Sequence, residues 1–213
     1  MAVADPEPDC RRCPRLAAFR DEWRSAEPAW HNGPVATFGP AHARLLIVGL
    51  APGLRGANRT GRPFTGDFAG DLLYQTLIKF GFARGRYTAR PDDGLELVDA
   101  AITNAVRCVP PQNKPVSAEI AQCRPFLEAT LAQMPKLKVM LALGRIAHDS
   151  VVRTFGLKLK EAPFGHGAVH EAGAGLSLYD SYHCSRYNTN TGRLSAEMFE
   201  AVFAAIRDDL SAR

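Results

Sequence analysis

The chain has 213 residues, enough for one domain of ordinary size or slightly more, and 46% of them are hydrophobic, which argues against disorder. Its formal net charge of +4 is mildly basic, so a polyanionic partner is permitted but not required. The N-terminus lacks the apolar segment of a signal peptide, and no apolar stretch approaches the roughly 20 residues that span a bilayer. We therefore expect a soluble, cytoplasmic protein with no membrane partner.

Helical and strand-like apolar patterns alternate along the chain. In order, they predict a helix over 14–26, a strand over 45–50, a helix over 70–80, a strand over 98–108, a helix over 117–133, a strand over 139–144, a helix over 145–155, a strand over 177–183 and a helix over 194–210. This alternation favours a single domain over residues 1–213, with the α/β fold of a three-layer αβα sandwich around a mostly parallel four-stranded sheet.

Each predicted strand ends in a polar or glycine-rich segment, and in a parallel sheet these ends gather at one edge, where sites lie. The richest segment follows the first strand, at 49–67. Its glycines let a ligand approach the backbone closely. The same segment also contains side chains suited to binding and chemistry, namely Asn58, Arg59, Arg62, Phe64, Thr65 and Asp67. We interpret it as a binding loop.

Four of the five cysteines have a spacing that suggests a metal site. Cys10 and Cys13 form a C-x2-C pair, and Cys108 and Cys123 lie far along the chain. A C-x2-C pair can reach one metal, and four thiolates can hold zinc or a cubane iron–sulfur cluster, which the spacing does not distinguish. The alternative is a set of free thiols. The fifth cysteine, Cys184, is expected to pack in the interior.

Longer motifs carry a resemblance to the uracil-DNA glycosylase superfamily, most closely to its family 5, also called type B. The motifs are GLAPGLRGANRTGRPFTGD (49–67), NAVRCVPPQNKP (104–115) and SYHCSRYNTNTGRL (181–194), and with LALGRIA (141–147) they extend the resemblance over nearly the whole chain. The resemblance implies a DNA repair enzyme that flips a deaminated base out of double-stranded DNA and hydrolyses its N-glycosidic bond. Uracil is the implied base, and hypoxanthine and xanthine are further candidates.

The resemblance also implies catalytic roles for three residues. Asp67 corresponds to the carboxylate that offsets the positive charge on the sugar and orients water, although an aspartate here could instead cap a helix. His183 corresponds to a hydrogen-bond donor to a base oxygen, and its alternative is a satisfied, partly buried histidine. Asn113 is implied to assist in placing water or substrate, and its alternative is a turn residue between prolines.

The resemblance also implies which residues bind the flipped base. Phe64 would stack on the flipped base, unless it is a plain core residue, and Asn104 would read the base edge through its amide, unless it only satisfies nearby backbone. The pocket wall would be completed by the backbone of Gly49, Leu50, Ala51 and Gly53. Leu50 stands where family 4 has an acidic residue, which favours family 5 and leaves Asp67 as the one carboxylate of the 49–67 segment.

DNA contacts and the metal group are also implied. The segment 185–193 resembles the loop that enters the duplex, with Arg186, Tyr187 and Asn188 as candidates, and its alternative is a solvated loop. Phosphate contacts are expected from Arg59, Arg62, Lys114 and Arg193.

The cysteine spacing resembles that of the 4Fe-4S ligands of families 4 and 5, so a 4Fe-4S cluster would join the N-terminal segment to residues 108–123. We expect a monomer. The competing hypothesis is a non-catalytic zinc or iron–sulfur module that binds nucleic acid.

Overall fold

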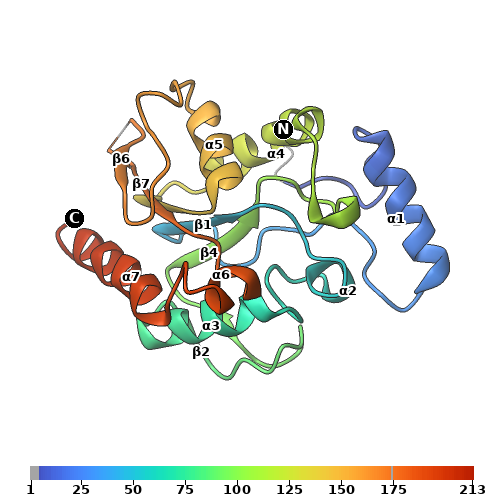
Figure 1. Cartoon of the computed structure of the whole chain (residues 1–213), viewed down its shortest axis with the longest axis horizontal. Helices are drawn as coiled ribbons and strands as arrows, with labels where there is room; N and C mark the ends of the chain where they lie inside the picture. Colours follow the sequence, from blue (N-terminus) through green and yellow to red (C-terminus); the bar gives the residue numbers. More distant parts are fainter. Residues whose placement is uncertain (1–4, 174) are drawn as a thin grey trace.

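A five-stranded sheet forms the centre of the molecule in this computed structural model, which describes residues 5–173 and 175–213. Residues 1–4, part of the N-terminal segment predicted to lack a signal peptide, and residue 174 lie outside the described residues. The strand order is β4-β1-β5-β7-β6 (Figure 1). Four strands pair in parallel, namely β1 (Leu45–Gly49), β4 (Ala100–Asn104), β5 (Val139–Leu143) and β7 (Ser177–Ser181), and the edge strand β6 (Val169–Glu171) is antiparallel to β7.

Helices cover both faces of the sheet. On one face lie α3 (Phe68–Lys79) and α7 (Ala196–Ser211), and on the other lie α4 (Ser117–Ala132) and α5 (Arg145–Thr154) (Figure 1). The predicted αβα sandwich with a mostly parallel sheet is therefore confirmed. Within the described residues, the structure contains no helix whose length and apolar character would let it cross a membrane.

Strand β1 illustrates why the sequence forms this sheet. All five of its residues are buried, as expected for a parallel strand covered on both faces. Leu45 and Ile47 pack into the core beneath α3 and α7, whereas Leu46 and Val48 pack into the core beneath α4 and α5. Side chains alternate between the faces of a strand, so one continuous apolar run supplies both cores.

The remaining elements are shorter and lie around the sandwich. Helix α1 (Pro14–Ala26) lies to one side of it, near the short helix α2 (Ala57–Thr60) (Figure 1). A two-stranded hairpin pairs β2 (Ala83–Arg84) with β3 (Glu96–Leu97). A 3-10 turn covers Pro111–Asn113, and α6 (Arg186–Asn190) follows β7.

The structure differs from the predicted boundaries at several places. The predicted strand 98–108 is shorter in the structure, where β4 pairs with β1 as far as Gly49 and Asn104. Backbone hydrogen bonds from the Ala105 and Val106 N–H groups to the Gly49 and Leu50 carbonyls extend the contact by two residues before the loops begin. Helix α3 begins at Phe68, two residues early, because the Asp67 side chain accepts a hydrogen bond from the Gly70 N–H and caps it. The segment 185–193, expected to be irregular, contains α6 with Ser185 as its cap. β6 and the β2–β3 hairpin were not predicted, because strands of two or three residues carry no readable period.

Candidate active site

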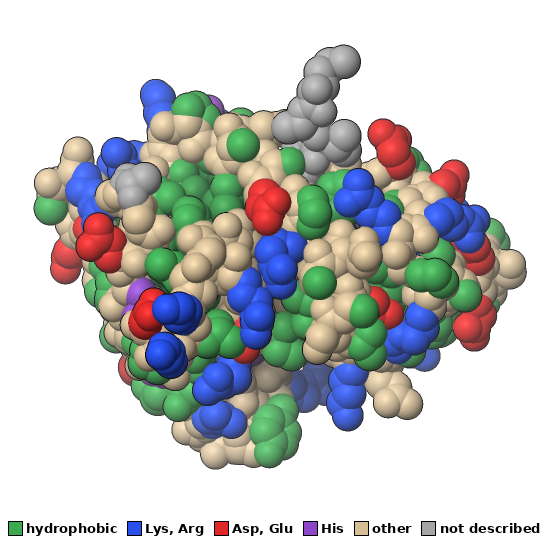
Figure 2. All heavy atoms as spheres, turned by 90° about the horizontal axis from the view of Figure 1, so that it is seen from above, with side chains coloured by type: hydrophobic (Ala, Val, Ile, Leu, Met, Phe, Trp, Pro, Cys, Tyr) green, Lys and Arg blue, Asp and Glu red, His purple; other side chains and the backbone are tan. Residues whose placement is uncertain are grey.

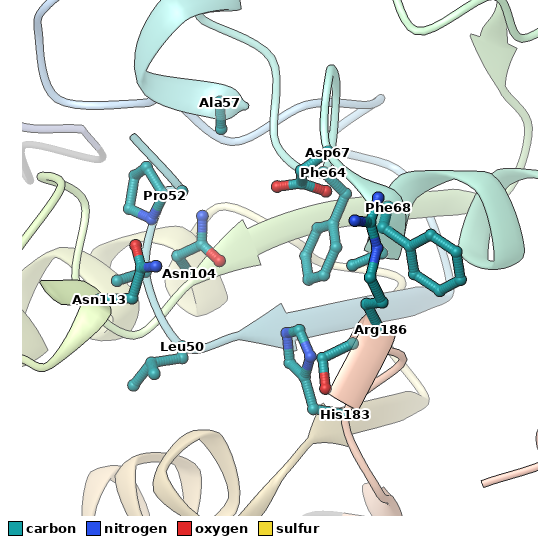
Figure 3. A pocket seen from close by; sticks show the side chains of 14 residues that line it. Leu50, Pro52, Ala57, Phe64, Asp67, Phe68, Asn104, Asn113, His183 and Arg186 are labelled. Carbon is teal, nitrogen blue, oxygen red and sulfur yellow. The ribbon is translucent and has the colours of Figure 1, made fainter. Parts of the chain in front are cut away.

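A pocket of about 290 Å³ opens at the carboxyl ends of β1, β4 and β7, the edge of the sheet at which the sequence predicts a site (Figure 3). Its wall comes from segments far apart in the sequence. The lining residues are Leu50, Ala51, Pro52, Gly53, Ala57, Phe64, Asp67, Phe68, Ala69, Asn104, Asn113, His183, Ser185 and Arg186. The structure thus brings together the three candidate catalytic residues and most of the candidate base-binding residues.

Asp67 has a position that serves two purposes. Its Oδ1 accepts from the Gly70 N–H at 3.3 Å, and its carboxylate also lines the pocket. Burial raises the pKa of Asp67 above the ordinary aspartate value, against the opposing effect of the Gly70 and Ala69 N–H groups. A Cβ added at Gly56 would approach Asp67 Oδ2 to 2.5 Å, so glycine at this position leaves room for the carboxylate. Helix capping and a pocket-facing carboxylate therefore coexist.

His183 follows the last parallel strand, and its ring lies next to the ring of Phe64 in the pocket (Figure 3). The two rings stack with their centroids 5.8 Å apart and an interplanar angle of 28°. Burial lowers the pKa of His183 to about 4, so the ring is a neutral imidazole that donates through one nitrogen only. Its backbone is held by Asn188, whose Nδ2 donates to the His183 carbonyl at 2.8 Å. Asn188 therefore has an interior partner in addition to its predicted place near DNA.

Phe64 and Asn104 line the pocket, and Gly49 lies against both of them without lining it. Phe64 is only 6% exposed and Asn104 only 2%, so both side chains are fixed by their surroundings. A Cβ added at Gly49 would lie 2.4 Å from Asn104 Oδ1 and 2.7 Å from Phe64 Cζ. The ring and the amide therefore occupy the space that any side chain at position 49 would need.

Asn113 enters the pocket from a strained turn. Gln112 and Asn113 both have φ of 56°, in the left-handed region, which asparagine tolerates better than most residues. The turn is tied to α1 because Arg15 Nη2 donates to the Lys114 carbonyl at 3.1 Å and also pairs with Glu119 at 2.7 Å. Asn113 is thus both the turn residue and a lining residue, and Lys114 is exposed.

Most of the predicted DNA contacts are exposed on the surface. Tyr187 is 73% exposed, and Arg59, Arg186 and Arg193 are also exposed. Arg186 lies over the Phe68 ring at 5.1 Å and lines the pocket mouth. Figure 2 shows one face of the molecule, on which Lys and Arg side chains spread over the middle and lower part while most acidic side chains lie towards the edges. Such a distribution suits a polyanion.

Arg62 corrects the sequence-based prediction of a phosphate contact. Its side chain is only 6% exposed and forms two hydrogen bonds to Asp93, at 2.8 and 2.9 Å. The guanidinium also lies against the rings of Phe38, Tyr74 and Tyr87. This buried pair prevents Arg62 from reaching a phosphate, and the prediction failed because Asp93 lies 31 residues away in the sequence.

Some lining residues were not predicted, although their neighbours in the motifs were. Phe68 and Ala69 directly follow Asp67, and Pro52 and Ala57 lie inside the 49–67 motif. Ser185, the fifth, lies inside the 181–194 motif. Position next to a predicted residue was the only signal for them, since apolar and small side chains carry no chemistry of their own.

The four spaced cysteines lie together beside α1. Cys10, Cys13 and Cys108 pack against buried Cys123 and an apolar group that includes Leu16, and together they line a cavity of about 20 Å³. Burial raises the pKa of Cys13 to about 11 and that of Cys108 to about 12. Without compensating positive charge, these sulfurs are thiols. Cys184 is fully buried elsewhere, as expected for a packing residue.

Two buried arginines supply positive charge next to the cysteines. Arg20 and Arg107 are at most 1% exposed, and the Arg107 backbone N–H donates to Cys123 Sγ at 3.2 Å. Arg20 acts to lower the pKa of Cys108, and Arg107 that of Cys123, although burial outweighs both. Among the described residues, Arg20 Nη2 and Arg107 Nε have no hydrogen-bond partner. The Arg107 guanidinium is itself paired with Asp5 at 2.7 Å, so the contacts that fit an anionic thiolate-bound group are the Arg107 backbone N–H at Cys123 and the Arg20 charge near Cys108.

A second group of possible ligands lies apart from the pocket, between α5, β6 and β7. Among the described residues, His148, His170 and Asp180 have one ligand atom each within 4.8 Å of the others. His148 Nδ1 lies 2.7 Å from Asp180 Oδ1 and its Nε2 lies 2.8 Å from the Ala162 carbonyl. With an acceptor on each nitrogen, the ring is satisfied as an imidazolium in a buried ion pair.

Comparison with known proteins identifies the family to which the chain belongs. Residues 36–207 match the family model described as the uracil DNA glycosylase superfamily. The chain belongs to this superfamily. The matched range includes every residue that lines the pocket, whereas Cys10 and Cys13 precede it.

Several curated relatives are similar over most of their length. A type-5 uracil-DNA glycosylase from Thermus thermophilus is 46% identical over 89% of this chain and 89% of its own. One from Mycobacterium bovis is 41% identical over 91% of this chain and 75% of its own. A type-4 uracil-DNA glycosylase from Pyrobaculum aerophilum is 32% identical over 65% of each chain. The resemblance to family 5 is therefore confirmed.

Proposed function

We propose that this chain is a DNA repair glycosylase of type 5, which hydrolyses the N-glycosidic bond of uracil in DNA and leaves an abasic site. The observation that carries the proposal is the pocket itself, where a carboxylate, a neutral imidazole and an aromatic ring converge (Figure 3). The similarity to type-5 uracil-DNA glycosylases over about nine-tenths of the chain supports the same conclusion. Such an enzyme acts where the DNA is, and we propose a cytoplasmic location.

The chemistry follows from where charge develops. As the glycosidic bond breaks, its electron pair leaves with the base and positive charge develops on the sugar. Asp67 offsets the positive charge and accepts a hydrogen bond from the attacking water, whose oxygen joins the sugar while its proton ends on the base. Neutral His183 donates to a base oxygen as negative charge develops there, an effect worth roughly 10²–10³ in rate.

Phe64 and Asn104, which lie among the catalytic groups, are proposed to bind the base. It must leave the stack to enter the pocket, where Phe64 offers its ring for stacking and Asn104 offers an amide to the base edge. The backbone of 49–53 completes the wall, and Asn113 places water or substrate. Hypoxanthine and xanthine are the further bases that we propose as substrates.

Double-stranded DNA is the proposed partner, bound by a monomer of this chain. We propose that Tyr187 and Arg186 enter the duplex and support the flipped state, since both are exposed beside the pocket. Phosphates are proposed to contact Arg59, Lys114 and Arg193, and binding is then expected to weaken as salt rises.

We also propose that Cys10, Cys13, Cys108 and Cys123 hold a 4Fe-4S cluster. The Arg107 backbone N–H at Cys123 Sγ and the Arg20 charge near Cys108 support an anionic group at these sulfurs. Among the described residues, the cysteines are not one of the groups compact enough to hold a metal ion as they stand, so the choice of a cluster over zinc rests on the cysteine spacing shared with families 4 and 5. Its contribution is to cross-link the N-terminal segment to residues 108–123, and the pocket residues carry out the hydrolysis.

A cleavage assay tests the function. Duplexes carrying uracil, hypoxanthine or xanthine are incubated with the protein and then treated with alkali, which breaks the strand at abasic sites. The Asp67→Asn variant is expected to lose roughly 10²–10⁴ in rate while it retains DNA binding. DNA binding without any abasic product in the wild type would instead favour the non-catalytic module.

A further inference from the structure

The loop that connects β2 to β3, residues 85–95, lies behind the pocket and contacts the turn that carries Phe64. From this loop, the Tyr87 hydroxyl donates to the Phe64 carbonyl at 3.1 Å. The Tyr87 ring also stacks on Tyr74, with centroids 4.6 Å apart and an interplanar angle of 26°. The loop therefore reaches a pocket residue through its backbone, without lining the pocket itself.

Phe64 needs such support because of its backbone conformation. Its φ is 52°, in the left-handed region that residues with a Cβ rarely adopt. A backbone of this kind persists only where the surrounding contacts hold it, and it is often found where a side chain must be presented to a ligand. The hydrogen bonds to the turn are therefore decisive for the direction of the Phe64 ring.

Three consecutive residues of the turn are held by hydrogen bonds from side chains. The Tyr74 hydroxyl donates to the Pro63 carbonyl at 2.6 Å, Tyr87 donates to Phe64, and Arg62 Nε donates to Thr65 Oγ1 at 2.7 Å. Burial raises the pKa of Tyr87 to about 12, so its hydroxyl is protonated and able to donate. Each of these donors fixes a different residue of the turn.

The Arg62–Asp93 pair fixes the loop against the turn. The Asp93 side chain is fully buried, and besides Arg62 it accepts from the backbone N–H groups of Thr88 and Leu95 at 2.9 and 3.1 Å. Its hydrogen bond with Arg62 lowers the pKa of Asp93, which keeps the carboxylate ionised. Tyr87 is thus held in place from both ends of its own loop.

There is little spare space around this contact. A Cβ added at Gly70 would lie 2.3 Å from the Tyr87 hydroxyl and would overlap the Phe64 carbonyl outright. On the pocket side, the Phe64 ring stacks on His183 and abuts Asn104. A change in the Phe64 backbone is therefore transmitted to the ring that faces the base.

We propose that Tyr87 is a positioning residue for base binding, which acts by holding the Phe64 carbonyl so that the Phe64 ring is presented to the flipped base. The proposal rests on the proposed glycosylase function. It assigns no contact between Tyr87 and DNA, and it predicts that Tyr87 matters only when a base occupies the pocket.

The test compares two DNA ligands, one with a base at the target position and one without. One duplex carries uncleavable 2′-fluoro-2′-deoxyuridine, and the other carries a tetrahydrofuran abasic analogue at the same position. The Tyr87→Phe variant is expected to weaken binding of the first roughly threefold to tenfold, the worth of one hydrogen bond, and to leave binding of the second unchanged. Tyr179→Phe is the matched control, because it removes a buried hydroxyl that bonds Asp209 in another part of the molecule, and it should change neither affinity.

Two further variants complete the test. Tyr74→Phe removes the hydrogen bond to the adjacent Pro63 carbonyl and is expected to weaken binding of the base-containing duplex alone. It therefore tests the same proposal if Tyr87→Phe does not fold. In a Phe64→Leu background, Tyr87→Phe should have no further effect on the base-containing duplex, because the ring it positions is gone. Equal effects on both duplexes, or no effect on either, would overturn the proposal. A wild-type protein that bound the base-containing duplex no better than undamaged DNA would instead refute the proposed function.

Discussion

Gly49→Ala tests whether the pocket wall depends on the missing side chain at the end of β1. The added Cβ would lie 2.4 Å from Asn104 Oδ1, 2.7 Å from Phe64 Cζ and 2.8 Å from Phe64 Cε2. These distances are shorter than ordinary contact by up to about 1 Å, so both side chains must move. Overpacking of this kind costs roughly 1–3 kcal/mol of folding free energy.

The effect on activity is expected to exceed the effect on stability. A displacement of about 1 Å at a positioned group can cost on the order of 10² in rate, so the single-turnover cleavage rate on a uracil duplex should fall about 100-fold. The free-energy cost corresponds to a melting temperature lower by about 2–10 °C, which leaves the protein folded at 25 °C. Single-turnover cleavage and thermal melting are measured on the same preparation.

Gly165→Ala provides the matched control. A Cβ at Gly165 would meet only Ala168 Cβ, at the ordinary distance of 3.6 Å, and Gly165 lies outside the pocket lining. This variant should retain wild-type cleavage. If Gly49→Ala cleaved uracil duplexes as fast as Gly165→Ala, the reasoning that Phe64 and Asn104 are fixed against the end of β1 would be wrong.

Three other predictions concern pH and the cysteines. Burial raises the pKa of Asp67, so as the pH is lowered the cleavage rate should begin to fall at a pH above 3.8, the ordinary aspartate pKa. The residual cleavage rate of Asp67→Asn should not show this fall. Burial lowers the pKa of His148, but Asp180, the Ala162 carbonyl and Asp149 together outweigh burial and leave the pKa raised above 6.5. The extra stability of wild type over His148→Gln should therefore be full below pH 6.5 and shrink as pH rises through the folded pKa; urea unfolding that showed this difference growing with pH would contradict the assignment. Purified protein should contain iron, and Cys123→Ser should lose iron and folded yield, whereas Cys184→Ser should keep its iron; colourless, zinc-loaded wild type would exclude the cluster.

The sheet and the place of the pocket were readable from the sequence because they depend on local patterns. β1, β4, β5 and β7 are apolar runs long enough to be seen, and the rule that parallel strands end at one edge then brings His183 to Asn104. The motifs supplied further lining positions, such as Asn113, which no pattern of apolar residues indicates.

The interactions that hold the pocket residues in place could not be predicted from the sequence, because they join residues that only the folded chain brings together. Arg62 resembles a surface cation in a glycine-rich loop until Asp93, from an unpredicted hairpin loop, covers it. Tyr87 carries no motif, and its importance follows from one hydrogen bond to a backbone carbonyl. Interactions between a side chain and a distant backbone group leave no trace in composition or periodicity.

The strand order of the sheet has a consequence for the synthesis of the protein. β7 lies between β5 and β6 and is the last strand to leave the ribosome, so a growing chain presents β5 as an unpaired parallel edge until residues 177–181 have emerged. At about 5–20 residues per second, the stretch between β5 and β7 takes seconds to appear, and exposed edges of this kind favour aggregation. His183 is the second residue after β7, so a chain that still lacks β7 also lacks this pocket residue, and activity requires the same strand that covers the exposed edge of β5.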